Sequence, residues 1–208
     1  MYTPGPNQIT DSALLLEAMR RWPFAILIGP LADTNGASAP DATHLPLVVK
    51  DEGEFGLLEG HFALANSHWR KLAGQEVLVV FQGAHSYVSP TLYADAVSVP
   101  TWNYIAIHAR GRLSLVEDEQ EKDELLLGMI RANEPPFAEK WRAMAEDFRR
   151  SMLGGIVGFR IPITRIEGKF KLSQNRIEVD RHTVEAAHAM GDDDQRELAG
   201  WMARLRGD

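Results

Sequence analysis

The stretch VLVVFQGAHSYVSPTLYADAVSVPTWNYIAIHA, residues 77–109, decides how the rest of the chain is interpreted. Two apolar runs of strand length, 77–81 and 104–109, enclose a connection rich in polar and aromatic side chains. Connections of this length are uncommon inside a compact domain and tend to be functional. We therefore predict two core strands joined by a loop, 82–104. This loop either binds a planar polar molecule or packs its aromatic rings onto the core as lids.

Further runs of strand length lie on both sides of this stretch. They are 24–28, 44–50 and 55–61 toward the N-terminus, and 112–116 and two runs within 156–172 toward the C-terminus. The run 105–109, inside the stretch, and the run 112–116 form either one long bent strand or two short ones. The loose stretch from Gly29 to Thr43 predicts a hairpin loop. Pro46 cannot donate to a sheet ladder, which predicts an edge or a bulge there. This succession of short antiparallel strands predicts a mainly β fold, a β-barrel with added helices.

Helical spacing of apolar residues occurs before, between and after these strands. It predicts helices over 13–21, 62–72 and 121–132, a helix carrying the apolar stripe Trp141, Met144, Phe148 and Met152, and closing helices over 177–188 and 195–206. The side-chain oxygens of Thr10, Asp11 and Ser12 can cap the start of the first helix. A stripe of this kind usually packs in a core or an interface. We expect a single domain over 1–208, with a helical insertion at 118–154 and a C-terminal helical segment at 176–208.

Composition excludes several classes of protein. The 208 residues include 22 Lys and Arg against 29 Asp and Glu, a formal net charge of −7, so that nucleic acid is repelled except at a local basic face. No cysteine occurs, which excludes disulfides, thiolate nucleophiles and cysteine-ligated metals. The N-terminus lacks the basic and apolar segments of an export signal, and we expect a cytoplasmic protein.

Motifs of several enzyme classes are missing. The chain contains no G-x-G-x-x-G after a strand, no G-x-x-x-x-G-K-S/T and no G-x-S-x-G, so neither a phosphate-binding glycine loop nor a hydrolase nucleophile is predicted. His61 and His68 lie seven residues apart, but no H-E-x-x-H motif accompanies them. We predict no metal site and no catalytic residue.

A set of short motifs, in order along the chain, resembles the PaiB-like proteins, which are described as FMN-binding negative transcriptional regulators. The motifs are Met1–Pro4, Trp22–Ala25, His44–Leu47, Gly60-His61, Phe81–Gly83, His85–Pro90, Val99–Tyr104, Ile156–Phe159 and Lys171–Arg176. The resemblance extends to about Arg181. It implies a split β-barrel related to the flavin reductases and pyridoxamine phosphate oxidases, assembled as a homodimer with FMN as cofactor.

The resemblance also implies which residues contact the flavin. These are His44, Leu45, Leu47, Gly60, His61, Asn66, Gln82, Lys171, Ser173, Gln174 and Asn175. Two positions depart from the usual pattern of the family, because Gly29 replaces a threonine and Leu64 replaces an arginine. An arginine at the second position would clamp a phosphate through charge-assisted hydrogen bonds.

Three functions remain open at this point: a negative transcriptional regulator, a flavin-dependent oxidoreductase, and a cofactor-free dimeric interaction protein. A direct contact with DNA has no helix-turn-helix to support it. The best basic cluster overlaps the residues that would hold a phosphate; it comprises Arg160, Arg165, Lys169, Lys171, Arg176 and Arg181.

Overall fold

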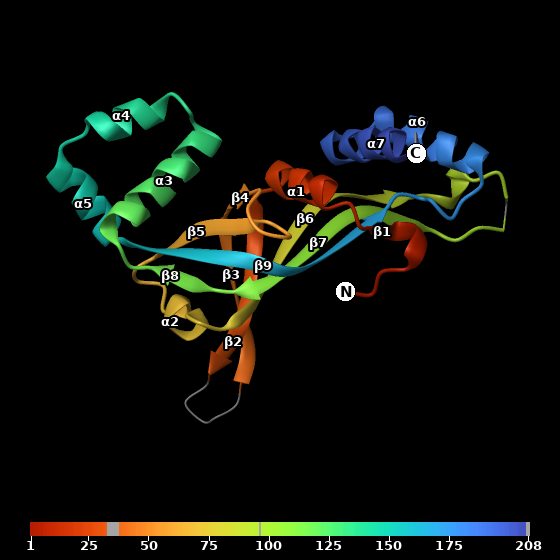
Figure 1. Cartoon of the computed structure of the whole chain (residues 1–208). Helices are drawn as coiled ribbons and strands as arrows, with labels where there is room; N and C mark the ends of the chain where they lie inside the picture. Colours follow the sequence, from red (N-terminus) through yellow and green to blue (C-terminus); the bar gives the residue numbers. More distant parts are fainter. Residues whose placement is uncertain (33–37, 96, 207–208) are drawn as a thin grey trace. The chain divides into compact units, whose positions relative to one another are not determined.

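A computed structural model describes residues 1–32, 38–95 and 97–206 of the chain (Figure 1). In chain order its elements, with η for a short 3-10 helix, are η1 (Gly5–Asn7), β1 (Gln8–Ile9), α1 (Ser12–Arg21), β2 (Phe24–Ala32), β3 (Ser38–Pro46), β4 (Val48–Lys50), β5 (Leu57–Ala63), α2 (His68–Leu72), β6 (Glu76–Val88), η2 (Pro90–Leu92), β7 (Thr101–Arg112), β8 (Ser114–Val116), α3 (Glu119–Asn133), α4 (Phe137–Ala143), α5 (Glu146–Gly154), β9 (Ile156–Lys171), α6 (Glu178–Ala189) and α7 (Asp193–Arg206). None of the helices in these residues is long and apolar enough to cross a membrane.

The strands form an antiparallel sheet with the order β3-β2-β6-β7-β9-β5-β4, and β1 and β8 each pair with β9. The predicted mainly β fold with a helical insertion and C-terminal helices is therefore confirmed. β3 lies at one end of this order and ends at Pro46. The edge position predicted from this proline is thus confirmed, because an edge strand needs no N–H for a second neighbour.

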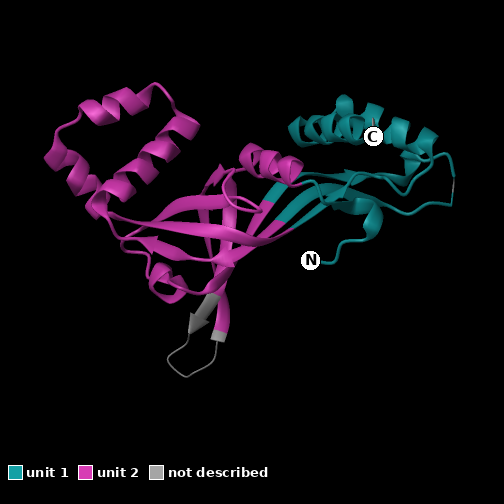
Figure 2. Cartoon of the chain, in the orientation of Figure 1, with its two compact units in different colours: residues 1–11, 82–107, 167–208 teal, residues 12–81, 108–166 magenta. Residues whose placement is uncertain are grey.

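The chain divides into two compact units (Figure 2). Unit 1 comprises Met1–Asp11, Gln82–Ile107 and Glu167–Asp208, and unit 2 comprises Ser12–Phe81 and His108–Ile166. The long strands β6, β7 and β9 contribute residues to both. Each unit has its own buried apolar residues.

Unit 2 holds the hairpin β2–β3, the strands β4, β5 and β8, and the helices α1 to α5. Its core includes Leu58, Phe62 and Phe159, all fully buried, and the rings of Phe62 and Phe159 lie 4.9 Å apart. α3 packs against β4, β5 and β8 through Leu125 and Met129. Buried apolar area of this kind contributes about 25 cal/mol per Å² to folding.

Unit 1 places α6 and α7 on one side of its strands (Figure 2). Phe170 of β9 is fully buried and meets Trp201 of α7 edge to face, with ring centroids 5.2 Å apart. Leu198 and Val184 are also fully buried, so each of the two helices contributes its apolar face to this core. The predicted closing helices are therefore confirmed.

Hydrogen bonds to Asp123 link the three helices of the insertion. Asp123 of α3 accepts hydrogen bonds from the Trp141 indole at 2.8 Å and from Arg149 at 2.7 Å, and so links α3 to α4 and α5. The predicted single helix through Trp141 and Met152 is wrong, because the chain breaks between α4 and α5. Trp141 is buried, whereas Phe148 and Met152 of α5 are about half exposed.

Three further predictions of extent are corrected. The stretch 82–104 is strand at both ends, because β6 runs to Val88 and β7 begins at Thr101, so the connection between the two strands is shorter than predicted. Its exposed and buried side chains alternate along 84–88, a two-residue period hidden by the polar composition. The helix expected at 62–72 is only α2, since Phe62 and Ala63 complete β5. The two strands expected within 156–172 are the single strand β9.

The predicted hairpin loop is also shorter than expected. β2 and β3 pair from Phe24 with Pro46 up to Ala32 with Ser38, so the ladder continues through most of the Gly-, Ala- and Asp-containing stretch. Residues 33–37 of the predicted loop lie outside the described residues.

Candidate functional site

The residues predicted to contact a flavin fall into two groups. Unit 2 holds His44, Leu45, Leu47, Gly60, His61 and Asn66, and unit 1 holds Gln82, Lys171, Ser173, Gln174 and Asn175. Among the described residues no group of His, Asp and Glu has the arrangement of a metal site.

A groove lies beside the break between β3 and β4. At the break, the Leu47 amide donates to the Pro23 carbonyl at 2.9 Å, and the side chains of Leu45 and Leu47 are buried. The groove has a volume of about 270 Å³ and is lined mainly by apolar residues, with one cation; they are Arg20, Pro23, Pro46, Leu47, Val48, Val49, Met129, Ala132 and Asn133. An apolar groove with few polar groups suits a planar ring.

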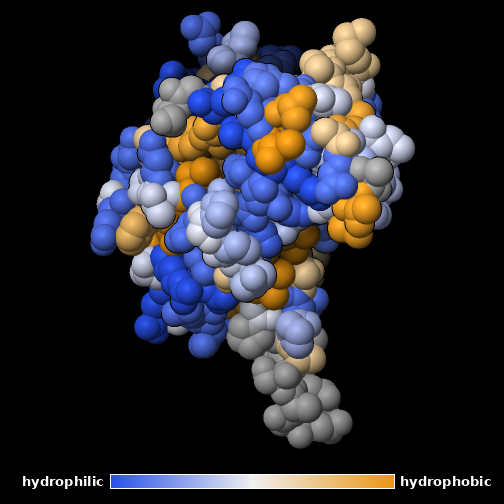
Figure 3. All heavy atoms as spheres, turned by 90° about the vertical axis from the view of Figure 1, so that its right-hand side faces the viewer, coloured by the Kyte–Doolittle hydropathy of each residue, from blue (hydrophilic) through white to orange (hydrophobic). Residues whose placement is uncertain are grey.

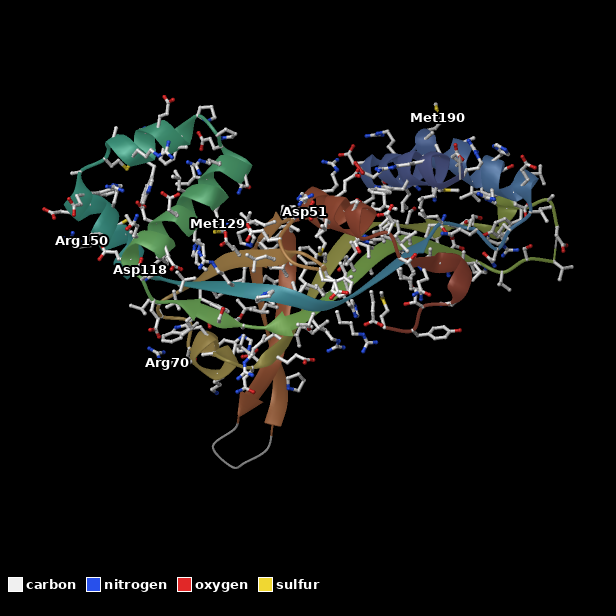
Figure 4. The ribbon with its side chains drawn as sticks, viewed as in Figure 1. Asp51, Arg70, Asp118, Met129, Arg150 and Met190 are labelled. Carbon is white, nitrogen blue, oxygen red and sulfur yellow. The ribbon has the colours of Figure 1, made fainter. Side chains whose placement is uncertain are left out.

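Gly60 and His61 lie on β5 beside this groove. A Cβ atom on Gly60 would lie 2.7 Å from Leu47 and 2.8 Å from Phe159, so glycine is required there by packing. Figure 4 labels Met129 on α3, and its sulfur lies 3.2 Å from Nδ1 of His61. Burial holds the pKa of His61 below its usual value, which favours a neutral imidazole at neutral pH.

A polar cluster ties α2 to β3. Thr43 Oγ1 lies 2.8 Å from Nδ1 of His68 and 3.5 Å from the side-chain nitrogen of Asn66, while Asn66 Oδ1 accepts from the His68 amide at 3.0 Å. His68 is 3% exposed, and its Nε2 has no hydrogen-bond partner among the described residues. Burial, the largest cause, lowers the pKa of His68, and Lys71 lowers it further against an opposing effect of Asp41.

The sequence did not predict that His68 belongs to a polar cluster with Thr43 and Asn66. The signal that could have found it was its position two residues after Asn66, where a short helix begins. The buried Nε2 is an unused hydrogen-bonding group, which is uncommon inside a folded protein.

The two departures from the family pattern also lie in unit 2. Leu64 is 45% exposed, so the position where the family carries arginine presents an aliphatic chain to solvent. Gly29 lies under α2, since a Cβ there would lie 2.2 Å from Leu72. A threonine at 29 therefore does not fit while Leu72 keeps its place.

In unit 1, two of the predicted residues hold a turn. Gln174 accepts a hydrogen bond from the Leu172 amide at 2.7 Å and donates to the Phe170 carbonyl, so that both ends of its amide are engaged. Ser173 is buried with φ +64° and donates to Asn103 at 3.1 Å. Their side chains are thus occupied by local structure, while Gln82 and Asn175 are exposed.

Lys171 ends β9 in unit 1. Its ammonium group donates to the Thr101 hydroxyl and to the Trp102 carbonyl. Burial lowers the pKa of Lys171, and the nearby charges of Lys169 and Arg176 lower it further. This lysine is therefore held in place near two other cations.

The donor set of unit 2 fits the ring of a flavin. The groove at Leu47 is mainly apolar. The neighbouring β5–α2 segment supplies His61 and Asn66 as hydrogen-bonding groups. The buried Nε2 of His68 has no hydrogen-bond partner among the described residues. The segment fits the phosphate less well, because Leu64 supplies no charge. Arg70 of α2, labelled in Figure 4, is instead stacked 4.4 Å over the Trp69 ring.

Sequence comparison identifies relatives that cover most of the chain. Residues 1–165 match the model of a family described as "Putative FMN-binding domain". The "Protease synthase and sporulation protein PAI 2" of Bacillus subtilis (strain 168) is 35% identical over 187 residues, which cover 88% of this chain and 87% of that protein. An uncharacterized protein of Emericella nidulans is 25% identical over 228 residues, with 88% of each chain covered.

Solved structures share the fold. The flavocytochrome Anf3 from Azotobacter vinelandii has a TM-score of 0.61 at 17% identity and covers 84% of this chain and 74% of its own. A FAD and heme binding protein from Mycobacterium smegmatis has a TM-score of 0.60 at 16% identity, with 79% and 73% covered. The fold is the split β-barrel that the motifs implied. Given the match over residues 1–165 and the 35% identity to the B. subtilis protein, the chain belongs to the "Putative FMN-binding domain" family, the PaiB-like group that its motifs resemble.

Proposed function

We propose that this chain is a cytoplasmic, homodimeric FMN-binding protein of the PaiB type that acts as a negative regulator of transcription. The observation that carries the proposal is the coincidence of the family match with the groove at Leu47 and the polar cluster around Asn66, all within residues 1–165. The B. subtilis relative is named after protease synthesis and sporulation, which are cellular processes and not chemical steps. That name supports a regulatory role.

Each predicted residue has a place in this proposal. Leu45 and Leu47 shape the groove for the isoalloxazine, Gly60 lets β5 approach Leu47, and His44, His61 and Asn66 supply polar groups. In unit 1, the family resemblance assigns Gln82, Lys171 and Asn175 to the flavin, and Ser173 and Gln174 hold the turn that carries Asn175. When bound, FMN would supply a redox-active ring.

Exposed apolar side chains support the homodimer. Val97 is 90% exposed and Val99 70% exposed in unit 1, and Phe148 and Met152 are about half exposed on α5 in unit 2. On the face shown in Figure 3, hydrophobic side chains gather in separate patches bordered by hydrophilic ones. Patches of this kind on a soluble protein often mark contacts with another chain.

The charges favour a regulator that binds DNA weakly on its own. Arg160, one of the predicted basic cluster, is paired with Glu59 at 2.9 Å and with Glu121 at 2.5 Å. With one cation neutralised and a net charge of −7, we expect weak, salt-sensitive and non-specific DNA binding.

Turnover assays separate this function from its alternatives. The FMN-loaded protein should not oxidise NADH or NADPH steadily in the presence of an electron acceptor. Steady oxidation would support the flavin-dependent oxidoreductase instead, and a chain that takes up no FMN would support the cofactor-free dimer. Gel shifts at physiological salt should show no sequence-selective band, and a tight selective band would contradict the expected weak DNA binding.

A further inference from the structure

A pocket in unit 1 combines aromatic rings with carboxylates. Its volume is about 520 Å³, and its lining comprises His85, Ser86 and Tyr87 of β6, Trp102 of β7, and Asp192, Asp193 and Asp194 around the start of α7. Among the described residues, no lysine or arginine lines this pocket. The pocket is therefore both aromatic and acidic.

Two of the rings are open to solvent and stand nearly at right angles. Trp102 is 52% exposed and Tyr87 is 49% exposed, and their ring centroids lie 6.1 Å apart with an interplanar angle of 76°. The His85 ring lies 6.3 Å from that of Trp102, at an angle of 28°. Exposed apolar surface of this kind often marks a place where another molecule binds, and the faces of tryptophan and tyrosine attract cations.

Hydrogen bonds hold the start of α7 beside these rings. The Gln195 side chain donates to the Ser86 hydroxyl at 3.1 Å, and a carboxylate oxygen of Asp194 lies 3.3 Å from Nδ1 of His85. Both contacts join β6 to a segment more than a hundred positions later in the chain. The carboxylates and the rings are thus fixed against each other, as in a preformed binding site.

Part of the acidity of the pocket has a structural role. Asp192 accepts a hydrogen bond from the Gln195 amide at 2.9 Å and so caps α7, while Asp193, with its side chain 98% exposed, is paired with Arg196. One arginine against three carboxylates leaves a net negative charge when His85 is neutral. Acidic residues in a first turn stabilise any helix, so it is the two exposed rings that indicate a ligand here.

We propose that the pocket lined by Tyr87, Trp102, Asp193 and Asp194 binds the ammonium group of a small organic cation. The faces of Trp102 and Tyr87 receive the cation, and the carboxylates supply the counter-charge. The same carboxylates disfavour a phosphate or another anion. All the lining residues belong to unit 1, whereas the groove at Leu47 lies in unit 2, so this site does not depend on the proposed flavin binding.

Choline is a suitable probe, because it carries a permanent positive charge and no acidic proton. At constant ionic strength, saturation-transfer NMR of its methyl signal should show saturable binding, and the Trp102 indole signal, which Trp102→Phe identifies, should shift over the same concentration range. The neutral analogue of choline, in which carbon replaces nitrogen, has the same shape and should bind about fivefold or more weakly.

Two variants test the rings and the carboxylates separately. Trp102→Leu should weaken choline binding by about fivefold or more, whereas Trp102→Phe, which keeps a ring, should retain most of the affinity. Asp193→Lys reverses a charge at a fully exposed position that carries no core contact, and it should also weaken binding by about fivefold or more.

Asp147→Lys is the matched control. Asp147 lies in the first turn of α5, its side chain is 99% exposed, and it pairs with Arg150 three residues later, as Asp193 of α7 pairs with Arg196. This variant should bind choline like the unaltered protein. The proposal fails if choline shows no saturable binding, if the neutral analogue binds as well as choline, or if Asp147→Lys weakens binding as much as Asp193→Lys.

Two competition experiments complete the test. Butylammonium, a primary amine, should displace choline, and the tighter binder of the two shows whether the pocket prefers a primary or a quaternary ammonium group. Saturating FMN should leave choline binding unchanged; displacement would place the flavin in this pocket and overturn the cation site. A protein that binds choline but no FMN would support the cation site while contradicting the proposed function, so the two failures are distinguishable.

Discussion

At the scale of single residues, the buried carboxylate of Glu59 is the clearest stabilising group. Glu59 is 1% exposed and pairs with Lys50 and Arg160, each at 2.9 Å. Glu59→Gln removes the buried counter-charge of both cations and leaves Arg160 with Glu121 at 2.5 Å and Lys50 with Glu52 at 3.9 Å. Because these cations are about one-third exposed, we expect a loss of about 1–3 kcal/mol in the free energy of unfolding, less than for a fully buried pair.

Urea denaturation measures this loss. Glu139→Gln, on the exposed surface of α4, is the control and should change stability by less than about 0.5 kcal/mol. Equal denaturation midpoints for the two variants would show that Glu59 contributes nothing beyond a surface charge.

His188 gives stability a dependence on pH. It is 1% exposed on α6, its Nε2 has no partner among the described residues, and burial lowers its pKa against an opposing effect of Asp192. The unfolded chain, with a histidine pKa of about 6.5, therefore takes up the proton first as the pH falls. The contribution of His188 is complete above that value and is lost progressively below it.

Denaturation between about pH 7.5 and about pH 5, a range that brackets an ordinary histidine pKa, tests this dependence. His188→Leu should flatten the fall in stability, whereas His182→Leu, on the exposed face of the same helix, should leave it in place. An unchanged slope for His188→Leu would show that burial of His188 does not contribute to the pH dependence of stability.

At the scale of elements, the turn after β9 is held by a side chain that sequence analysis assigned to the flavin. Gln174→Ala removes hydrogen bonds to Leu172 and Phe170, and we expect a loss of about 1–3 kcal/mol in the free energy of unfolding. Asn175→Ala, at an exposed neighbour, should change stability little. Thermal unfolding checks both, and the reverse order of the two losses would contradict a structural role for Gln174.

The sequence predicted the kinds of elements better than their ends. Pro46 predicted an edge strand, and Thr10 to Ser12 predicted the start of α1, because proline and capping residues act through local backbone chemistry. The extension of β6 to Val88 was missed, since alternating burial depends on a neighbouring strand and not on composition. The network of Thr43 with His68 was missed for the same reason, because its partners are distant in sequence.

At the scale of the whole molecule, the exposed apolar residues predict a homodimer. Light scattering of the purified protein at micromolar concentration should give twice the 23.2 kDa mass of one chain. Phe148→Ser and Val99→Ser test which patch takes part, because a residue at the centre of an interface weakens association when made polar. A monomer mass for the unaltered protein would contradict the dimer.

A fluorescence titration with FMN tests flavin binding by this chain most directly. The fluorescence of added FMN should be quenched, and the quenching should saturate as the protein concentration rises. Leu64→Arg should bind FMN more tightly, by about tenfold or more, because it adds a charge-assisted contact to the phosphate. Leu64→Met, a matched change without charge, should bind like the unaltered protein. We expect saturable quenching by the unaltered protein and tighter binding by Leu64→Arg alone. The absence of saturable quenching in both the unaltered protein and Leu64→Arg would contradict flavin binding.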